Sequence, residues 1–472
     1  MLVLLMRASP RSTAATDVAQ QILQTALAAG SSGVGRAGSM TDWHGAGASR
    51  VRAYTVIAGC LVHSAGYVLS LYRIPGPPPG QGVGAPSPEA TRGGGGKPVV
   101  LLQHGLLDSC AGWLLAGQER ALAFLLADAG FDVWLGNARG STQSRRHAWL
   151  PLTSPQYWAF SWDEMAQLQS GLEGKALQHW VLATAPLQYD LPAEVSLIQR
   201  VTGASRLAYV GHSQGCTVLL AALASQPQLA AQLSLAVLLA PVALARHSSS
   251  VPLTSLAALG TDGVFTLLGW HEFLPSIRLV SWLEGELCGG LRPDLCVSLL
   301  AAICGYRQDA LDTRQLPAML KYTPAGTSVQ NMAHWVGGKG QGGVGGRGGA
   351  AAHHQMVEGG ARGSLRAGGP APAPRTCNQE AYNQSSPPEY RLGDIPPTMR
   401  LALFTGGQDR LADPLDVEFL IEALPPGVVV ARQHDPDLEH LDYIWAQDAR
   451  PRVYLPLLRL LRNHLPGATP AA

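Results

Sequence analysis

A surplus of charge of one sign is missing from this chain of 472 residues, and charged residues of either sign are scarce. Lys and Arg total 34 and Asp and Glu total 33, so the formal net charge is only +1 at pH 7. This balance creates no overall field that would draw the protein onto nucleic acid, and we expect no nucleic-acid partner. Hydrophobic residues make up 46% of the chain and charged residues 14%, which excludes a globally disordered protein.

Cysteines and long apolar runs are also few. The seven cysteines are unevenly spaced, which argues against a disulfide-built scaffold and against zinc sites of the CxxC type. No unbroken apolar run reaches the roughly 18 residues that a membrane-spanning helix needs, so we expect none. The apolar stretch Met1–Met6 is too short for a secretory signal, and the Arg, Ser and Ala residues after it fit an organelle transit peptide only weakly.

Glycine and proline, in contrast, are abundant, with 54 and 34 residues. They cluster in three segments that lack apolar periodicity: Ser31–Gly47, Pro75–Gly96 and Gly337–Arg375. This composition is typical of flexible surface segments, and we predict that none of the three packs against the core.

Short β-branched or leucine-rich runs alternate with helical patterns between these segments. Strands are predicted over Val99–Gln103, Asp132–Leu135, Leu207–Val210, Ser234–Leu239, Leu401–Phe404 and Val428–Arg432. Helices are predicted over Glu119–Ala129, Ala193–Arg200, Cys216–Ser225, Pro414–Ala423 and Arg452–Arg462. The alternation predicts a doubly wound α/β fold with a mostly parallel sheet. From Ala243 to about Val329 the alternation stops, and the Leu- and Trp-containing pattern there indicates a helical insertion.

A Gly-x-Ser-x-Gly pentapeptide, Gly211-His-Ser-Gln-Gly215, lies between a predicted strand and a predicted helix. This setting is typical of the turn that presents a nucleophilic serine, because a sharp bend strains the serine backbone and only glycine fits the crowded flanking positions. We predict that Ser213 is a nucleophile whose hydroxyl lies exposed above the sheet. The alternative is a glycine-rich turn that carries an ordinary serine.

A serine hydroxyl needs a base to take its proton, and the base needs a carboxylate to orient it. In α/β hydrolases these follow the serine in the order acid, then histidine. Asp409 lies at the end of a predicted strand, whereas Asp413 precedes a proline and is more typical of a helix N-cap, so we favour Asp409 as the acid. His440 follows the last predicted strand and precedes an apolar run that can begin a helix. The competing histidines are His334, His353, His354 and His434.

Acyl transfer also needs N–H donors for the oxyanion, commonly from the residue after the nucleophile and from the loop after an early strand. Gln214 follows the serine and supplies the first. The strand at Val99–Gln103 ends in His104-Gly105, so we predict the N–H of Leu106 as the second donor. Leu106 can equally be a buried apolar residue, since only its backbone is used.

With these residues in view, the chain resembles the acid lipase family of α/β hydrolases, which includes gastric and lysosomal acid lipases. The resemblance covers about Tyr54 to the C-terminus. The matching stretches are Gly66-Tyr-Val-Leu-Ser-Leu-Tyr-Arg-Ile-Pro75, Gln103-His-Gly-Leu-Leu107, Ala127-Asp-Ala-Gly-Phe-Asp-Val-Trp-Leu-Gly-Asn-Ala-Arg-Gly140, Phe160-Ser-Trp-Asp-Glu-Met-Ala166, Tyr189-Asp-Leu-Pro192, Gly211-His-Ser-Gln-Gly215, Asn331-Met-Ala-His-Trp335 and His440-Leu-Asp-Tyr-Ile-Trp445.

The resemblance implies an α/β-hydrolase fold with Ser213, Asp409 and His440 as the catalytic triad and Leu106 and Gln214 as oxyanion donors. It also implies domain boundaries. The poorly matching residues 1–53 precede a first core part at 54–242, which a helical cap at 243–384 separates from a second core part at 385–472. Insertions at 167–188 and 337–375 depart from the family pattern. A Cys288–Cys296 disulfide in the cap is implied for some family members, and reduced cysteines are the alternative.

The function that the sequence predicts is a serine carboxylester hydrolase acting on neutral lipids such as triacylglycerols or steryl esters. It would use an acyl-enzyme, no metal and no organic cofactor. Its predicted partner is the lipid substrate or a lipid–water interface, and the resemblance implies a secretory or lytic compartment or a lipid-droplet or membrane surface. An acyltransferase and an inactive lipid-binding protein are the alternatives. A competent site needs the Ser213 hydroxyl within about 2.6–3.2 Å of His440.

Overall fold

The computed structural model describes the chain in ranges. These are 47–51, 54–63, 65–76, 96–117, 119–166, 168–169, 187–188, 190–250, 271–273, 305–312, 315, 319, 322–337, 355–357 and 389–465. They include both ends of the first predicted core part and almost all of the second.

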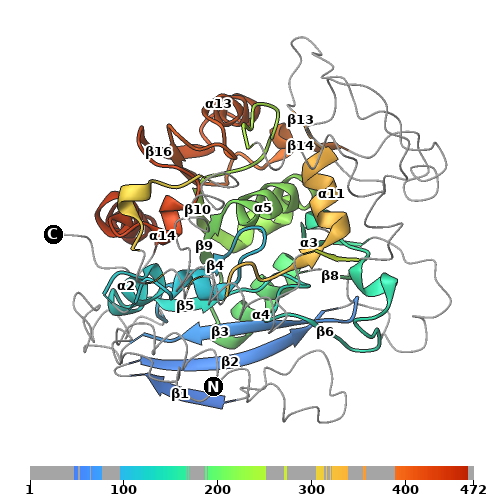
Figure 1. Ribbon diagram of the computed structural model, residues 1–472. Coiled ribbons are helices and arrows are strands. Elements are labelled where there is room, and N and C mark those ends of the chain that lie inside the picture. The colour runs from blue at the N-terminus through green and yellow to red at the C-terminus, as the bar shows by residue number, and fades with distance from the viewer. Residues whose placement is uncertain are drawn as a thin grey trace, which may run out of the picture.

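A twisted ten-stranded sheet runs through the described part of the chain (Figure 1). Nine strands follow one another across it, and β6 (Arg146–His147) pairs with β3 off this path. The spatial order is β1 (Gly47–Val51), β2 (Tyr54–Val62), β3 (Tyr67–Ile74), β5 (Asp132–Leu135), β4 (Val99–Gln103), β9 (Leu207–His212), β10 (Leu233–Leu239), β15 (Leu401–Gly406) and β16 (Val429–Asp435). Every pairing from β5 to β16 is parallel, as predicted, while β1, β2 and β3 form an antiparallel edge.

Alternating side chains of the central strands enter two separate hydrophobic cores. Val100 and Leu102 of β4 face one core, and Val99 and Leu101 face the other. Successive side chains of a strand point to opposite faces, so a strand covered on both faces is apolar at every position. This explains why the central strands could be recognised from short uninterrupted apolar runs.

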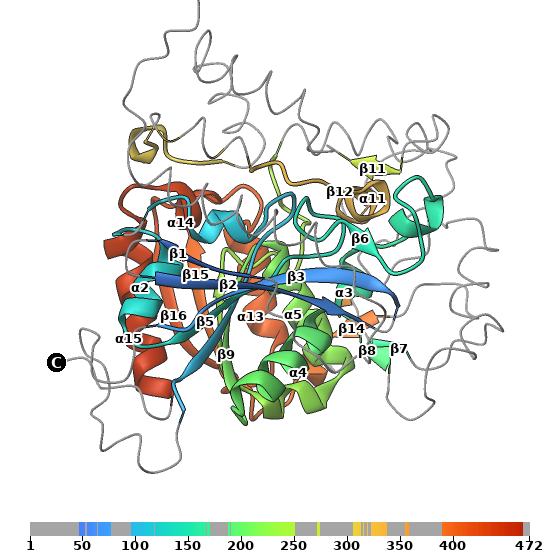
Figure 2. The same cartoon turned by 90° about the horizontal axis from the view of Figure 1, so that it is seen from below.

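Helices cover both faces of the sheet (Figure 2). The first core contains side chains of α2 and α15, and the second contains side chains of α3, α4 and α5. The α-helices of the described ranges are α2 (Leu122–Asp128), α3 (Trp162–Ala166), α4 (Asp190–Thr202), α5 (Gln214–Ser225), α11 (Val329–Gly337), α13 (Pro414–Ala423), α14 (Asp442–Trp445) and α15 (Leu455–His464). None of the helices in the described ranges is long and apolar enough to cross a membrane.

Parallel pairing gathers the carboxyl ends of five strands at one edge of the sheet. Gln103 at the end of β4 lies opposite Gly211, and Leu239 at the end of β10 lies opposite His212. On the other side of β10, β15 and β16 end as neighbours at Gly406 and Asp435. The loops that follow these strands therefore meet, which is where an open parallel sheet places its active site.

Four of the five predicted helices have different bounds. The helix predicted over Glu119–Ala129 begins only at Leu122, and the helices predicted over Ala193–Arg200 and Cys216–Ser225 begin earlier, at Asp190 and Gln214. Pro192 fits the first turn of α4, where its missing N–H has no acceptor within the helix. The helix predicted over Arg452–Arg462 is a π-helical turn, Arg450–Tyr454, followed by α15.

Pro456 explains the π-helical turn at Arg450–Tyr454, because proline lacks the N–H that would donate to the carbonyl of Arg452 in an α-helix. That carbonyl instead accepts a hydrogen bond from Gln433 Nε2 at 2.9 Å.

The antiparallel edge of the sheet was not predicted from the sequence. β1 lies within residues 1–53, which the predicted boundaries placed before the core. The prediction that Gly337–Arg375 does not pack is wrong at one place, because β13 (Gln355–Val357) pairs in parallel with β14 (Glu389–Arg391). Backbone pairing needs no apolar periodicity, so composition alone missed it.

The ends of the predicted insertion at 167–188 lie side by side. β7 (Leu168–Gln169) and β8 (Leu187–Gln188) pair in antiparallel fashion, so the chain leaves α3 and returns at the start of α4. Cys288 and Cys296, with most of the predicted cap, lie outside the described residues, and the domain boundaries stay a prediction.

Candidate active site

The candidate nucleophile lies at the junction of β9 and α5, in a backbone conformation that L residues rarely adopt. Ser213 has φ 52° and ψ −118°. A Cβ on Gly211 would lie 2.8 Å from the Tyr209 ring, and one on Gly215 would lie 2.6 Å from the Gln103 carbonyl oxygen of β4. Both positions therefore require glycine, because no Cβ would fit. The close packing around them maintains the strained backbone of Ser213.

The serine is less accessible than predicted. Only 8% of Ser213 is exposed, whereas we expected its hydroxyl to lie open above the sheet. The loops after β4 and β16 close around it. A Cβ on Gly105 would lie 3.0 Å from the Ser213 Cβ, and His440 bonds to the hydroxyl from the other loop. The site is thus a buried cluster.

Ser213, His440 and Asp409 form a continuous hydrogen-bonded chain. His440 Nε2 lies 2.8 Å from Ser213 Oγ, and His440 Nδ1 lies 2.9 Å and 3.0 Å from the two oxygens of Asp409. Both His440 and Asp409 are 2% exposed. Because a carboxylate can only accept, Nδ1 carries a proton, and the neutral ring turns its Nε2 lone pair toward the serine hydroxyl.

Asp409 is held by the turn in which it lies. Its Oδ1 accepts hydrogen bonds from the N–H groups of Leu411 and Ala412, at 2.9 Å and 2.8 Å. Asp413, the competing acid, instead caps α13 by accepting from the N–H of Leu415. The structure therefore brings Asp409, and not Asp413, against His440.

The competing histidines that the structure describes have other contacts. His334 Nδ1 lies 3.1 Å from the Ser161 hydroxyl, and His434 Nδ1 lies 3.0 Å from the Thr405 hydroxyl. His353 and His354 lie outside the described residues.

Both predicted oxyanion donors flank the serine. Gln214 is the first residue of α5, where a helix has no internal acceptor for its N–H. Leu106, half-buried, follows Gly105 in the loop against Ser213. Within the described part of the chain, neither the backbone N–H of Leu106 nor that of Gln214 donates a hydrogen bond. Both groups are thus available to bind an oxygen atom.

His104 fixes the loop that carries Leu106. Its Nε2 accepts from the N–H of Ala138 at 3.0 Å, so the proton of the neutral ring lies on Nδ1, which donates to the carbonyl of Gly105 at 2.8 Å. Burial lowers the pKa of His104 to about 4, against the opposing effect of the Gly105 hydrogen bond. The neutral ring is therefore the form that holds the loop near neutral pH.

His212, the residue before the nucleophile, contacts the loop of His440. Its Nε2–H donates to the carbonyl oxygen of His440 at 3.0 Å, and the two rings lie with centroids 5.1 Å apart. Burial, and then the neighbouring His440, lower the pKa of His212 to about 3. A neutral His212 adds no positive charge beside the histidine that must accept the serine proton.

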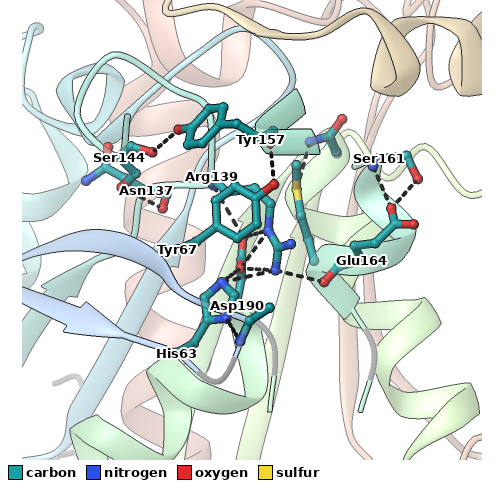
Figure 3. A network of polar contacts seen from close by, with 12 residues as sticks. His63, Tyr67, Asn137, Arg139, Ser144, Tyr157, Ser161, Glu164 and Asp190 are labelled. Carbon is teal, nitrogen blue, oxygen red and sulfur yellow. Dashed lines mark hydrogen bonds and ion pairs between the residues drawn. The ribbon is translucent and has the colours of Figure 1, made fainter. Parts of the chain in front are cut away.

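A buried ion pair joins Arg139, in the loop after β5, to Asp190, at the start of α4 (Figure 3). Arg139 donates from Nε to Asp190 Oδ1 at 2.9 Å and from Nη2 to the same oxygen at 2.6 Å. Burial alone would raise the pKa of Asp190, but the charge of Arg139 outweighs it and the pKa falls to about 2. The guanidinium also lies 4.3 Å from the centroid of the Tyr67 ring. The pair ties α4 to the loop after β5.

His63 also contacts Asp190, and its ring is neutral. Its Nδ1 accepts from the N–H of Ala65 at 3.1 Å, so its Nε2 carries the proton and lies 3.1 Å from Asp190 Oδ1. Burial, with the charge of Arg139, lowers the pKa of His63. At the edge of Figure 3, Glu164 accepts from Ser161 and caps the start of α3.

No role was predicted from the sequence for His104, Arg139, Asp190 or His212, or for Asn331 and Trp335, whose side chains donate to the side chain of Gln214. All six residues lie inside the stretches that carried the family resemblance. A polar residue that is part of a family motif but has no role in the predicted chemistry is the signal that could have singled them out.

Comparison with known proteins gives consistent results. A family model described as "alpha/beta hydrolase fold" matches residues 98–255, and one described as "Partial alpha/beta-hydrolase lipase region" matches residues 64–117. Lysosomal acid lipase/cholesteryl ester hydrolase of Rattus norvegicus is 35% identical over 402 residues, which cover 84% of this chain and 86% of that protein.

Two further relatives match over a similar length. Lipase member K of Mus musculus is 36% identical over 401 residues, covering 85% of this chain and 86% of that protein. Gastric triacylglycerol lipase of Rattus norvegicus is 34% identical over 398 residues, covering 84% of this chain and 86% of that protein.

Proposed function

This chain belongs to the acid lipase family of α/β hydrolases, and on that basis we propose that it hydrolyses neutral lipid esters, such as triacylglycerols or steryl esters, with Ser213 as its nucleophile. The relatives that match over most of its length are named as lipases, and the chain is a carboxylic ester hydrolase by the same similarity. The observation that carries the residue assignment is the 2.8 Å contact between Ser213 Oγ and His440 Nε2 in a strained strand–helix turn.

In the proposed reaction, Ser213 Oγ attacks the ester carbonyl carbon while His440 Nε2 takes its proton. Asp409 holds the Nδ1–H of His440 and stabilises the imidazolium that forms. The N–H groups of Leu106 and Gln214 bind the negative oxygen of the tetrahedral intermediate. His440 then gives its proton to the departing alcohol, which leaves an acyl group on Ser213.

Water then hydrolyses this acyl-enzyme, and His440 again acts first as the base and then as the acid. His440 takes a proton from the water, the hydroxide attacks the acyl carbon, and Ser213 regains its proton as the fatty acid leaves. No step needs a metal or an organic cofactor.

The two alternatives are less well supported. An inactive lipid-binding protein would tolerate a broken triad, whereas the contacts of His440 lie within the range that a working site needs. An acyltransferase would share the acyl-enzyme, but the relatives that match over most of this chain carry lipase or hydrolase names.

A fluorescent fluorophosphonate tests the proposal, because it reacts quickly only with an activated serine beside an oxyanion site. We expect rapid labelling of the wild type and none of Ser213→Ala, together with a loss of triolein and cholesteryl oleate hydrolysis of roughly 10⁴-fold or more. Ser225→Ala, at the other end of α5, is the matched control and should label like the wild type. Ester hydrolysis that survives in folded Ser213→Ala would refute the assignment.

A further inference from the structure

The side chain of Gln214 is held by a helix that lies far away in the sequence. Gln214 Oε1 accepts from Asn331 Nδ2 at 2.9 Å and from Trp335 Nε1 at 2.8 Å. Both donors belong to α11, which lies beside α3 and α5 in Figure 1. Two donors on one oxygen fix the orientation of the amide, and the backbone N–H of the same residue is the proposed oxyanion donor.

Asn331 is itself fixed from several sides. Its Oδ1 accepts from the N–H of Trp162 at 2.8 Å, its Nδ2 also reaches the Thr327 hydroxyl at 3.0 Å, and its own N–H donates to the Ser328 hydroxyl at 2.9 Å. The residue is fully buried. An amide with so many bonds has one orientation, so it can act as a rigid support for Gln214.

The same stretch of chain also holds the loop of the second donor. The N–H of Ala325 donates to the carbonyl of Leu107 at 2.7 Å, and the Thr323 hydroxyl donates to Asp108 Oδ1 at 3.1 Å. Leu107 follows Leu106 and has φ 60°, a strained value that needs support from its surroundings. We name the stretch Thr323–Trp335 the oxyanion clamp.

We infer that the oxyanion clamp sets the positions of both oxyanion N–H groups, with Asn331 and Trp335 as positioning residues that act through Gln214. Leu106 lies in the loop after β4 and Gln214 lies at the start of α5, and the described hydrogen bonds include none between them. A shared support is therefore what keeps them aimed at one point, and a small misplacement of such donors weakens transition-state binding more than substrate binding. The inference rests on the proposed function, since it assumes that Leu106 and Gln214 bind the oxyanion.

Trp335→Phe is the gentler test, because it keeps an aromatic ring near Trp162 and removes the Nε1–H donor. We expect kcat for p-nitrophenyl butyrate to fall about 10-fold with KM unchanged, as for the loss of one supporting hydrogen bond. Asn331→Asp keeps the shape but turns a carboxylate oxygen toward Gln214 Oε1, and we expect a loss of kcat of up to about 10²-fold.

The kcat of each variant is calculated per active site, and the concentration of active sites is titrated by the end point of fluorophosphonate labelling. Misfolded protein, which does not label, therefore does not lower the measured kcat. Trp113→Phe is the matched control. Trp113 is buried, and its Nε1 has no hydrogen-bond partner in the part of the chain that the structure describes. We expect its kcat per titrated site to match the wild type, and the pH profiles of Trp335→Phe and Trp113→Phe to be unshifted, because neither variant adds a titratable group or touches the His440–Asp409 pair.

A double-mutant cycle tests whether the clamp acts through Gln214. In a Gln214→Ala background, Trp335→Phe and Asn331→Asp should have little further effect on kcat, because the group they hold is gone. Full additivity, or wild-type kcat per site in both single variants, would overturn the inference. If Ser213→Ala is inactive while the clamp variants are normal, only the inference fails. If Ser213→Ala retains activity, the proposed function itself fails.

Discussion

The triad and the oxyanion donors, which together make up the candidate site, are held in different ways. Each triad member contacts the next, and Asp409 is fixed by N–H groups two and three residues along its own turn. Leu106 and Gln214 are not bonded to each other among the described contacts and take their support from the oxyanion clamp. Groups that bind one another keep their geometry locally, whereas backbone donors aimed at an empty point need an external support.

The largest effect should come from breaking the triad at its carboxylate. Asp409→Asn keeps the size of the side chain but presents an amide donor to His440 Nδ1, which favours the wrong tautomer, and kcat should fall roughly 10⁴-fold. Asp413→Asn, at the N-cap of α13, is the control. It should change kcat little because asparagine also caps helices well. Steady-state kinetics on p-nitrophenyl butyrate compares the two, and equal losses would contradict the assignment of the acid.

Loss of the buried Arg139–Asp190 ion pair should lower the folding stability more than it lowers kcat, in contrast to changes in the oxyanion clamp. Arg139→Met leaves Asp190 buried without its cation, and such a loss costs about 3–5 kcal/mol of folding free energy. Thermal unfolding should show a large drop in Tm, while kcat per titrated site in the folded fraction changes less than in Asn331→Asp. The reverse pattern would show that the ion pair, and not the clamp, sets the oxyanion geometry.

A smaller effect should appear as acid sensitivity of the oxyanion loop. The pKa of His104 falls to about 4 on burial, below its ordinary value of 6.5 in the unfolded chain. Its contribution to stability is therefore complete above pH 6.5 and is lost as the pH falls through 6.5 toward 4, by at most roughly 1.4 kcal/mol per pH unit.

His104→Asn keeps a donor for the Gly105 carbonyl and does not titrate. The difference in Tm between the wild type and this variant should shrink between pH 7 and pH 5. A Tm difference that does not depend on pH would show that protonation of His104 does not cause the loss of stability in acid.

The sequence by itself determined the parallel sheet and the order of the triad. Strands buried on both faces are continuous apolar runs, so Val99–Gln103 and Asp132–Leu135 were predicted with the bounds that the structure has. Parallel pairing then brings the ends of β9, β15 and β16 together, and this places Ser213, Asp409 and His440 near one another. The nucleophile turn is local, since its glycines lie two residues on either side of the serine.

Only the tertiary structure decided which residues support the site. Arg139 and Asp190 lie 51 residues apart, Gln214 and Asn331 lie 117 apart, and His212 and His440 lie 228 apart. No period or spacing links such pairs, because their contact depends on how whole elements pack. For the same reason the sequence predicted an exposed Ser213 and the structure buries it, since the loops that close around the serine come from other strands.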